Sequence, residues 1–208
     1  MTLPASTAAQ LESIRSQLAA KSPRWGDGET HIPVERYFDP AIWQAEIRGL
    51  FRALPLVAAH SSEIATGQVL ACDTFDVPVL IARDAEGVVR AFLNVCRHRG
   101  MRLVDAGDSA HSRASVVCPY HGWSYRLDGR LRHMLHAEAF DACPAGARDL
   151  VQLPCEERHG LVWVVPDAHA KIDLPAFLGS LDAELAFCDL PSLRSFASSR
   201  RSTTRTGS

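Results

Sequence analysis

Apolar residues recur at helical intervals near the start of this chain. Leu11, Ile14 and Leu18 fall on one face of a helix. Thr7 and Gln10 stand before them with the spacing of a capping box, in which two side chains close the first turn of a helix. We therefore expect an amphipathic helix that begins at Thr7 and lies against its own domain or against another subunit.

A second helix is indicated at Asp39. The Asp39 carboxylate is a favourable N-cap, and Pro40 follows in the first helical position, where a missing N–H costs no hydrogen bond. The next apolar residues keep helical spacing: Ile42, Trp43, Ile47, Leu50 and Phe51. We expect a helix over residues 39–51.

From residue 68 the pattern changes to that of strands. Three segments are rich in β-branched and other apolar residues, 69–75, 77–83 and 88–94. Residues 84–87, Asp-Ala-Glu-Gly, are expected to join the last two as a hairpin. Pro78 stands near the start of its strand. Because proline cannot donate a backbone hydrogen bond, this position favours an edge strand.

Shorter strands are expected further along. Residues 116–117 and 124–127 flank a short loop, Asp128-Gly129 is a strong signal for a tight turn, and residues 161–165 are apolar enough to be buried on both faces. Many short strands imply a small all-β domain over residues 56–166.

The end of the chain returns to helical spacing. Residues 171–190 are expected to form one helix with an apolar face made of Leu174, Phe177, Leu178, Leu181 and Leu185. Residues 194–208 are mostly Ser, Thr and Arg, so they cannot bury enough surface to become ordered. We predict a mainly β protein in four parts: a helical arm and lead-in over 1–55, a β domain over 56–166, a helical extension over 167–193 and a disordered tail over 194–208.

Composition narrows the functional classes. The chain has 208 residues, 47% of them apolar, and a net charge of −2, so nothing implies a general affinity for nucleic acid or membranes. No apolar run is long enough to span a bilayer, and residues 1–10 lack the features of a secretory signal, so a cytoplasmic location is expected. Of the six cysteines, Cys72, Cys143, Cys155 and Cys188 are most simply free thiols.

Two short segments supply a complete set of metal ligands. Cys96 and His98 stand in Cys-Arg-His-Arg-Gly, and Cys118 and His121 stand in Cys-Pro-Tyr-His-Gly-Trp. Two thiolates and two imidazoles suit one tetrahedral zinc ion or a [2Fe–2S] cluster with both Cys on one iron and both His on the other. Structural zinc sites usually pair like ligands, whereas each segment here offers one Cys and one His. The pattern therefore favours a cluster gripped between two similar loops.

At these residues the chain resembles the Rieske [2Fe–2S] proteins, whose motif is C-x-H followed by C-x-x-H. The resemblance implies stacked antiparallel sheets with the cluster at one tip, held by Cys96, His98, Cys118 and His121. The spacer between the motifs is slightly longer than usual, and the extra residues are expected in a surface loop over 107–113.

Three residues distinguish the subtype. Met101 and Tyr120 stand where the respiratory type carries a loop disulfide, which agrees with a reducing compartment. Trp123 stands where that type places a serine that hydrogen-bonds the cluster. Fewer such bonds lower the reduction potential, so we expect about −150 mV.

Residues 37–51 carry a further resemblance, to the lead-in of the alpha subunits of aromatic-ring-hydroxylating oxygenases. The resemblance implies an electron donor that is a flavin-containing reductase or a ferredoxin, and an assembly as a homo-oligomer or with a small beta subunit. It also implies a mononuclear non-haem iron in a C-terminal catalytic domain. We expect that domain to be absent from this chain, which would then transfer electrons without hydroxylating a substrate itself.

Three alternatives remain open at this point. His133, His136 and Glu138 could form an iron-binding triad or be exposed loop residues. The chain could be an intact Rieske-type ferredoxin, although such carriers usually lack the flanking helices. More remotely, it could be a zinc-stabilised interaction module.

Overall fold

The computed structural model describes residues 4–23, 28–74, 76–106, 109–110, 115–140 and 144–194. The predicted tail after Arg194 and the thiol of Cys143 lie outside these described residues. Cys72, Cys155 and Cys188, which were expected to be free thiols, are in no disulfide within the described residues.

The chain contains the following helices and strands. The α-helices are α1 (Ala5–Ala20), α2 (Pro40–Glu46), α3 (Leu174–Leu178) and α4 (Leu181–Phe187). Short helical turns are η1 (Val34–Tyr37), η2 (Ile47–Phe51), η3 (Ser61–Glu63), η4 (Ala137–Ala139) and η5 (Leu190–Ser192). The strands are β1 (Leu56–His60), β2 (Val69–Thr74), β3 (Val77–Arg83), β4 (Val89–Leu93), β5 (Ser109–Ala110), β6 (Ser115–Val117), β7 (Ser124–Arg126), β8 (Leu131–His133), β9 (Gln152–Leu153), β10 (Cys155–Arg158) and β11 (Leu161–Val164).

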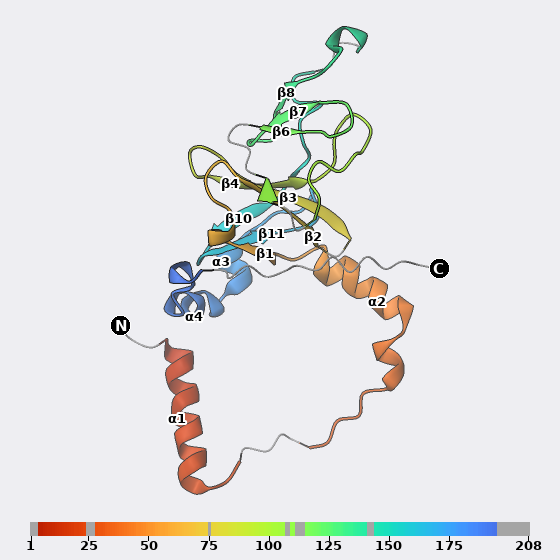
Figure 1. Ribbon diagram of the computed structural model, residues 1–208. Helices are drawn as coiled ribbons and strands as arrows, with labels where there is room; N and C mark the ends of the chain where they lie inside the picture. Colours follow the sequence, from red (N-terminus) through yellow and green to blue (C-terminus); the bar gives the residue numbers. More distant parts are fainter. Residues whose placement is uncertain are drawn as a thin grey trace.

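Within the described residues the strands form three antiparallel sheets. Their strand orders are β1-β11-β10, β5-β2-β3-β4-β9 and β6-β7-β8. Figure 1 shows the sheets stacked as layers, with β6-β7-β8 at one end and α3 and α4 beyond the β1-β11-β10 sheet at the other. The predicted fold class, stacked antiparallel sheets with flanking helices, is confirmed.

The five-stranded sheet is buried on both faces because successive side chains of a strand point to opposite sides. Leu80 and Ala82 of β3 join a core shared with β6 and β7, while Val79 and Ile81 join a second core shared with β1 and β11. Phe92 of β4 belongs to the first core. The middle sheet therefore separates two apolar cores, and the first of them lies beneath the Cys/His loops.

The predicted hairpin at residues 84–87 is present. It joins β3 to β4 in the register Arg83 opposite Val89, and the Gly87 amide donates to the Asp84 carbonyl over 3.1 Å. The edge position predicted from Pro78 is wrong, because β3 pairs with both β2 and β4. Pro78 lies opposite Asp73 near the end of the pairing, where its carbonyl accepts from the Asn94 amide.

The apolar segment 161–165 is buried on both faces, as predicted. It forms β11 between β1 and β10. Val162 and Val164 point into the second core, and Trp163 packs against Leu174 and Leu178 of α3. This strand therefore attaches the C-terminal helices to the sheets.

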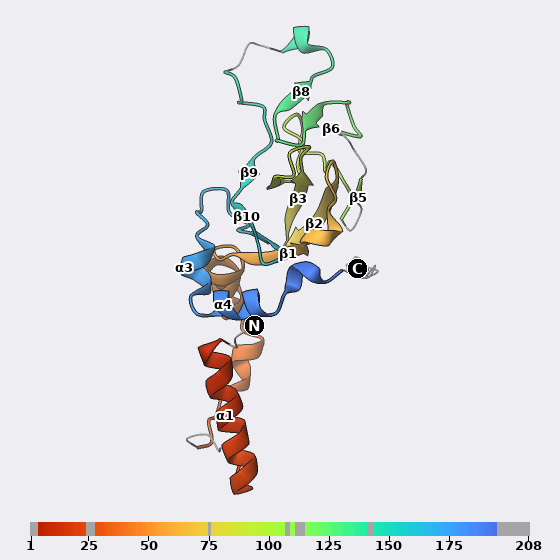
Figure 2. The ribbon, with the colours of Figure 1, turned by 90° about the vertical axis from the view of Figure 1, so that its left-hand side faces the viewer.

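Both predicted N-terminal helices are present, but only the second begins where it was predicted to begin. Asp39 caps α2 as predicted, its carboxylate accepting from the Ala41 amide over 2.8 Å. The capping box at Thr7 is wrong, because α1 begins two residues earlier at Ala5 after Pro4. The Thr7 hydroxyl instead donates to Glu184 of α4. Figure 2 shows α1 extending away from the sheets beyond this contact.

The single helix predicted over residues 171–190 is broken. Gly179 takes a left-handed φ of 52° between α3 and α4, a conformation that favours glycine. Leu174 and Leu178 are buried as expected, whereas Phe177 and Leu181 are exposed. Of the predicted surface loop over 107–113, Ser109 and Ala110 form strand β5 paired with β2, and the rest lies outside the described residues.

Gly129 allows a stability test with a matched control. Its φ is +88°, and a Cβ there would clash with the ring of Phe92. Gly87 has a similar φ of +82° with no atom near the place of a Cβ. We expect Gly129→Ala to lower the free energy of unfolding by about 2–5 kcal/mol and Gly87→Ala by about 1–2 kcal/mol. Urea titrations of both variants measure this, and equal losses would contradict the clash.

No helix among the described residues is both long and apolar enough to cross a membrane.

Candidate metal centre

Two loops with the same backbone frame carry the predicted ligands. In the first, the Cys96 amide donates to the Met101 carbonyl over 2.8 Å, and the Gly100 amide donates to the Cys96 carbonyl over 3.0 Å. In the second, the Cys118 amide donates to the Trp123 carbonyl over 2.7 Å, and the Gly122 amide donates to the Cys118 carbonyl over 3.1 Å. Each loop thus closes between its cysteine and the residues four and five positions later.

The glycines are required by this frame. Gly100 and Gly122 have φ values of +73° and +69°, and no atom lies within 4 Å of a Cβ built on either. The backbone conformation, rather than lack of space, therefore favours glycine at both positions. The two loops have the same length, although the histidine stands two residues after Cys96 in the first and three residues after Cys118 in the second.

The loops bring the predicted ligands together as one pair of thiols and one pair of imidazoles. Cys96 and Cys118 are 2% and 3% exposed, and the ring centroids of His98 and His121 lie 4.7 Å apart. The cysteines are buried at the base of the loops, and both imidazoles are only partly buried. The two thiols therefore lie in the protein interior, and the two imidazoles lie nearer the solvent.

The protonation chemistry suits a metal centre. Nδ1 of His121 is buried and has no hydrogen-bond partner among the described residues, so a bound metal would satisfy it. Burial, with the charges of His121 and Arg99, lowers the pKa of His98 and favours the neutral imidazole that metals require. Burial raises the pKa of Cys96, and nearby Cys118 adds to this, so metal binding would release a proton there. The donor set fits a [2Fe–2S] cluster.

Tyr125 is a functional candidate that the sequence reasoning missed. Its side chain is fully buried, and its hydroxyl oxygen lies 3.3 Å from Cys96 Sγ and 3.0 Å from the Arg97 amide. Because the Arg97 amide can only donate, the Tyr125 hydroxyl accepts from it and keeps its own hydrogen for the sulfur. Burial raises the pKa of Tyr125, so the hydroxyl stays protonated at neutral pH. The sequence signal that could have identified Tyr125 was the alternation of side chains along the strand, which places every second residue of β7 in the core.

Asn94 was also missed. It is fully buried just before the first loop. Its side-chain amide donates to the Val104 carbonyl over 2.7 Å, and its side-chain oxygen accepts from the Leu103 and Val104 amides, each over 3.2 Å. The sequence signal that could have identified Asn94 was its place as a polar residue at the end of an apolar strand. Asn94 therefore joins the two ends of the first ligand loop.

Aromatic rings cover the two histidines unequally. Trp123, which is 2% exposed, stacks on His98 at 4.8 Å with an interplanar angle of 7°. Phe140 stands edge-on to both His98 and Trp123, at 5.6 and 5.3 Å. Tyr120 lies on His121 at 3.7 Å but is 57% exposed. Water is therefore excluded more fully from the His98 side.

The other residues singled out in the sequence lie apart from this centre. His136 contacts Glu138 over 3.4 Å, with both side chains exposed. Throughout the described ranges, no three Cys, His, Asp or Glu side chains form a group that could hold one ion, so the possible triad with His133 is not assembled. Arg97 and Arg99 are exposed beside His98.

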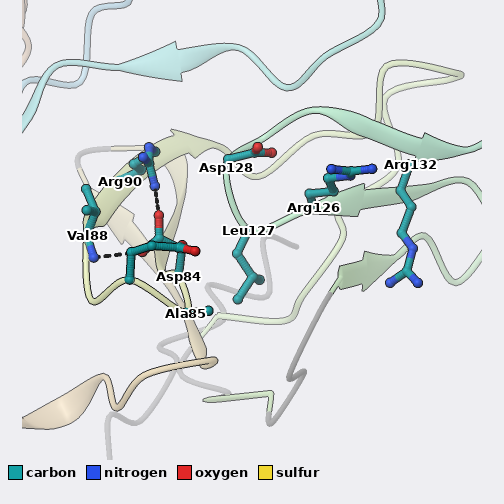
Figure 3. Close-up of a pocket in the computed structure, with 9 residues that line it drawn as sticks. Asp84, Ala85, Val88, Arg90, Arg126, Leu127, Asp128 and Arg132 are labelled. Carbon is teal, nitrogen blue, oxygen red and sulfur yellow. Dashed lines mark hydrogen bonds and ion pairs between the residues drawn. The ribbon is translucent and has the colours of Figure 1, made fainter.

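A pocket of about 590 Å³ lies elsewhere, between the 84–87 hairpin and β7-β8. Figure 3 shows Asp84 bound to the Val88 amide and to Arg90, with Arg126 and Arg132 projecting from the neighbouring strands. Its three arginines face three carboxylates, and none of the four candidate ligands lines it: Asp84, Ala85, Glu86, Val88, Arg90, Arg126, Leu127, Asp128 and Arg132. This pocket is therefore separate from the metal centre.

Comparisons with known proteins agree with this geometry. Residues 55–154 match the family model of the Rieske [2Fe–2S] domain. The glycine betaine monooxygenase oxygenase subunit of Chromohalobacter salexigens is 34% identical over 180 residues, which cover 85% of this chain and 39% of the relative. The biphenyl 2,3-dioxygenase subunit alpha of Rhodococcus jostii is 31% identical over 173 residues, covering 78% of this chain and 37% of the relative.

Solved structures give the same result. The quaternary ammonium Rieske monooxygenase CntA, with an inhibitor bound, superposes with a TM-score of 0.72 at 25% identity, covering 80% of this chain and 46% of that one. Naphthalene 1,2-dioxygenase with indole bound superposes with a TM-score of 0.61 at 29% identity, covering 69% and 32%. The chain thus spans less than half the length of these relatives, consistent with an N-terminal half. Its residues 55–154 are a Rieske [2Fe–2S] domain, homologous to that of Rieske oxygenase subunits.

Proposed function

We propose that this chain accepts one electron at a time and passes it on, through a Rieske [2Fe–2S] cluster held by Cys96, His98, Cys118 and His121. The observation that supports this is the pair of loops with matching backbone hydrogen bonds, in which the two buried thiols lie near each other and the two imidazole rings lie 4.7 Å apart. A cluster bound there supplies a centre that gains and loses a single electron. The two sulfur ligands come from the protein interior, and the histidines form the side open to a redox partner.

The surrounding residues suit this role. Trp123 and Phe140 keep water from one face of His98, and Tyr125 directs a hydrogen bond at Cys96. Excluding water reduces the reorganisation that accompanies a change of charge. The apolar core around Cys96 and Cys118 and the hydrogen bonds of Asn94 hold the two loops in the same conformation in both redox states.

We further propose that the electron comes from a flavin-containing reductase or a ferredoxin, in the cytoplasm. Arg97 and Arg99 expose two guanidinium groups on either side of His98. Neither side chain forms a hydrogen bond or ion pair within the described part of the chain, so both can meet a partner with an acidic surface. This arrangement supports docking of a donor directly over the histidine side of the centre.

The chain is proposed to act within an oxygenase rather than as a stand-alone ferredoxin. The superposition on CntA covers 80% of the chain, more than the Rieske match alone, and therefore extends into the flanking segments. The relatives act on two substrate classes by name: quaternary ammonium compounds, such as glycine betaine and carnitine, and aromatic compounds, such as biphenyl and anthranilate. The aromatic class predicted from the sequence is thus one of two proposals for the complete oxygenase, and turnover of glycine betaine against biphenyl separates them.

Reconstitution tests the electron-transfer proposal. The full chain, supplied with iron and sulfide under reducing conditions, is expected to bind two iron and two sulfide ions and to show visible absorbance that bleaches on one-electron reduction. Iron and sulfide analysis with a redox-monitored visible spectrum measures this. One zinc ion bound in place of iron, without colour, would support the zinc-stabilised module instead.

A further inference from the structure

Arg148 contacts the outer side of the aromatic rings that cover His98. Its guanidinium carbon lies 5.9 Å from the ring centroid of Trp123 and 5.2 Å from that of Phe140. Both distances fall within the range of cation–π attraction, which is strengthened when the ring is removed from water, as Trp123 is. A positive charge therefore stands one ring away from a candidate metal ligand.

The same two rings transmit this contact to His98. Trp123 lies parallel to the imidazole at 4.8 Å, and Phe140 meets its edge at 5.6 Å. Arg148 also places Nη1 3.4 Å from Met134 Sδ. The guanidinium group thus packs on the segment that follows β8 as well as on the ring of the second ligand loop.

The two residues that follow Arg148 are held by hydrogen bonds. The next residue, Asp149, accepts a hydrogen bond from the Leu131 amide at the start of β8 over 2.8 Å. The Leu150 amide donates to the Gly129 carbonyl over 2.9 Å. The fold therefore holds the chain next to Arg148 against β8, and the guanidinium group itself contacts Met134, Trp123 and Phe140.

We propose that Arg148 is a positioning residue that holds Trp123 and Phe140 over His98 and raises the reduction potential of the centre. This inference rests on the proposed function. One-electron reduction by the donor protein adds one negative charge to the site, and a fixed cation nearby stabilises the charged product. The effect is larger here than at an open surface because the buried ring of Trp123 and the partly buried ring of Phe140, rather than water, fill the intervening space.

Three substitutions in the full reconstituted chain test this. Arg148→Gln removes the charge, Arg148→Lys keeps a cation without the flat guanidinium, and Arg126→Gln removes an equal charge from an exposed arginine on β7 that lines the separate pocket. Redox titration at one fixed, low ionic strength measures the midpoint potential of each. We expect Arg148→Gln to have a lower potential than both the unsubstituted chain and Arg126→Gln, with Arg148→Lys closer to the unsubstituted chain.

Two results would overturn the role of Arg148. One is a potential for Arg148→Gln equal to that of Arg126→Gln; the other is an equal fall for Arg148→Lys and Arg148→Gln. The visible spectrum separates this failure from failure of the proposed function. A normal cluster spectrum with an unshifted potential rejects only the Arg148 proposal, whereas an unsubstituted chain without that spectrum rejects both.

Discussion

Cys118→Ser is expected to abolish cluster binding, with iron falling from two per chain to near zero after reconstitution. A serine hydroxyl is not deprotonated at neutral pH, so one of the two sulfur ligands is lost and nothing nearby replaces it. Cys118 is 3% exposed at the base of the second loop, where solvent cannot supply a substitute. Iron analysis and the visible spectrum of the reconstituted chain measure the loss.

Cys72→Ser is the matched control. Cys72 is also a buried free thiol, 5% exposed, but it lies on β2 in the core on the far side of the middle sheet. Both substitutions bury a hydroxyl in a core, so both carry a similar cost to stability, of about 1–3 kcal/mol. Only Cys118→Ser should lose iron. A full cluster spectrum in Cys118→Ser, or an equal loss in Cys72→Ser, would show that Cys118 is not a ligand.

Tyr125→Phe is expected to lower the midpoint potential by about 40–80 mV. A hydrogen bond to a charged sulfur is worth about 1.5–3 kcal/mol, and it is stronger when the centre carries the extra electron. A difference of about 1–2 kcal/mol between the two redox forms corresponds to about 40–80 mV for a one-electron couple. Redox titration of the reconstituted variant measures the shift.

Tyr120→Phe is the control for this hydroxyl. Tyr120 lies on the ring of His121 but is 57% exposed, and no hydrogen bond of its hydroxyl occurs in the described chain. Its potential should stay within about 10 mV of the unsubstituted chain. If the midpoint potentials of Tyr125→Phe and Tyr120→Phe shift equally, the hydrogen bond to Cys96 does not tune the potential of the centre.

The midpoint potential of the unsubstituted chain tests the low value of about −150 mV predicted from Trp123. A value above about +100 mV would contradict that prediction.

Local patterns were sufficient wherever a structure depends on neighbours in the sequence. The hairpin at residues 84–87, the Asp39 cap of α2 and the strand of residues 161–165 follow from turn chemistry, a single hydrogen bond and a run of apolar residues. The four candidate ligands were readable for the same reason, because each pair lies within one short loop. Bringing the two imidazoles to 4.7 Å from each other then needed only that the two loops lie side by side.

The wrong predictions all concern choices between partners distant in the sequence. Pro78 looked like an edge residue because its missing N–H is a local property, while the pairing of β3 with two neighbours is not. The capping box at Thr7 was available locally, but the hydroxyl reaches Glu184, 177 residues later. The helix breaks at Gly179, and Leu174 and Leu178 before the break pack on Trp163. Helical spacing alone does not reveal this contact with a distant strand.

The sequence by itself predicted the candidate ligands and determined the kind of cluster and the mainly β class, because these depend on residue types at short spacing. Only the tertiary structure decided the environment of that ligand set. The hydroxyl of Tyr125, the ring of Phe140 and the cation of Arg148 lie near Cys96 and His98 but come from strands and loops 29 to 50 positions further along the chain. Contacts over such separations arise from the stacking of the sheets, which no local pattern encodes.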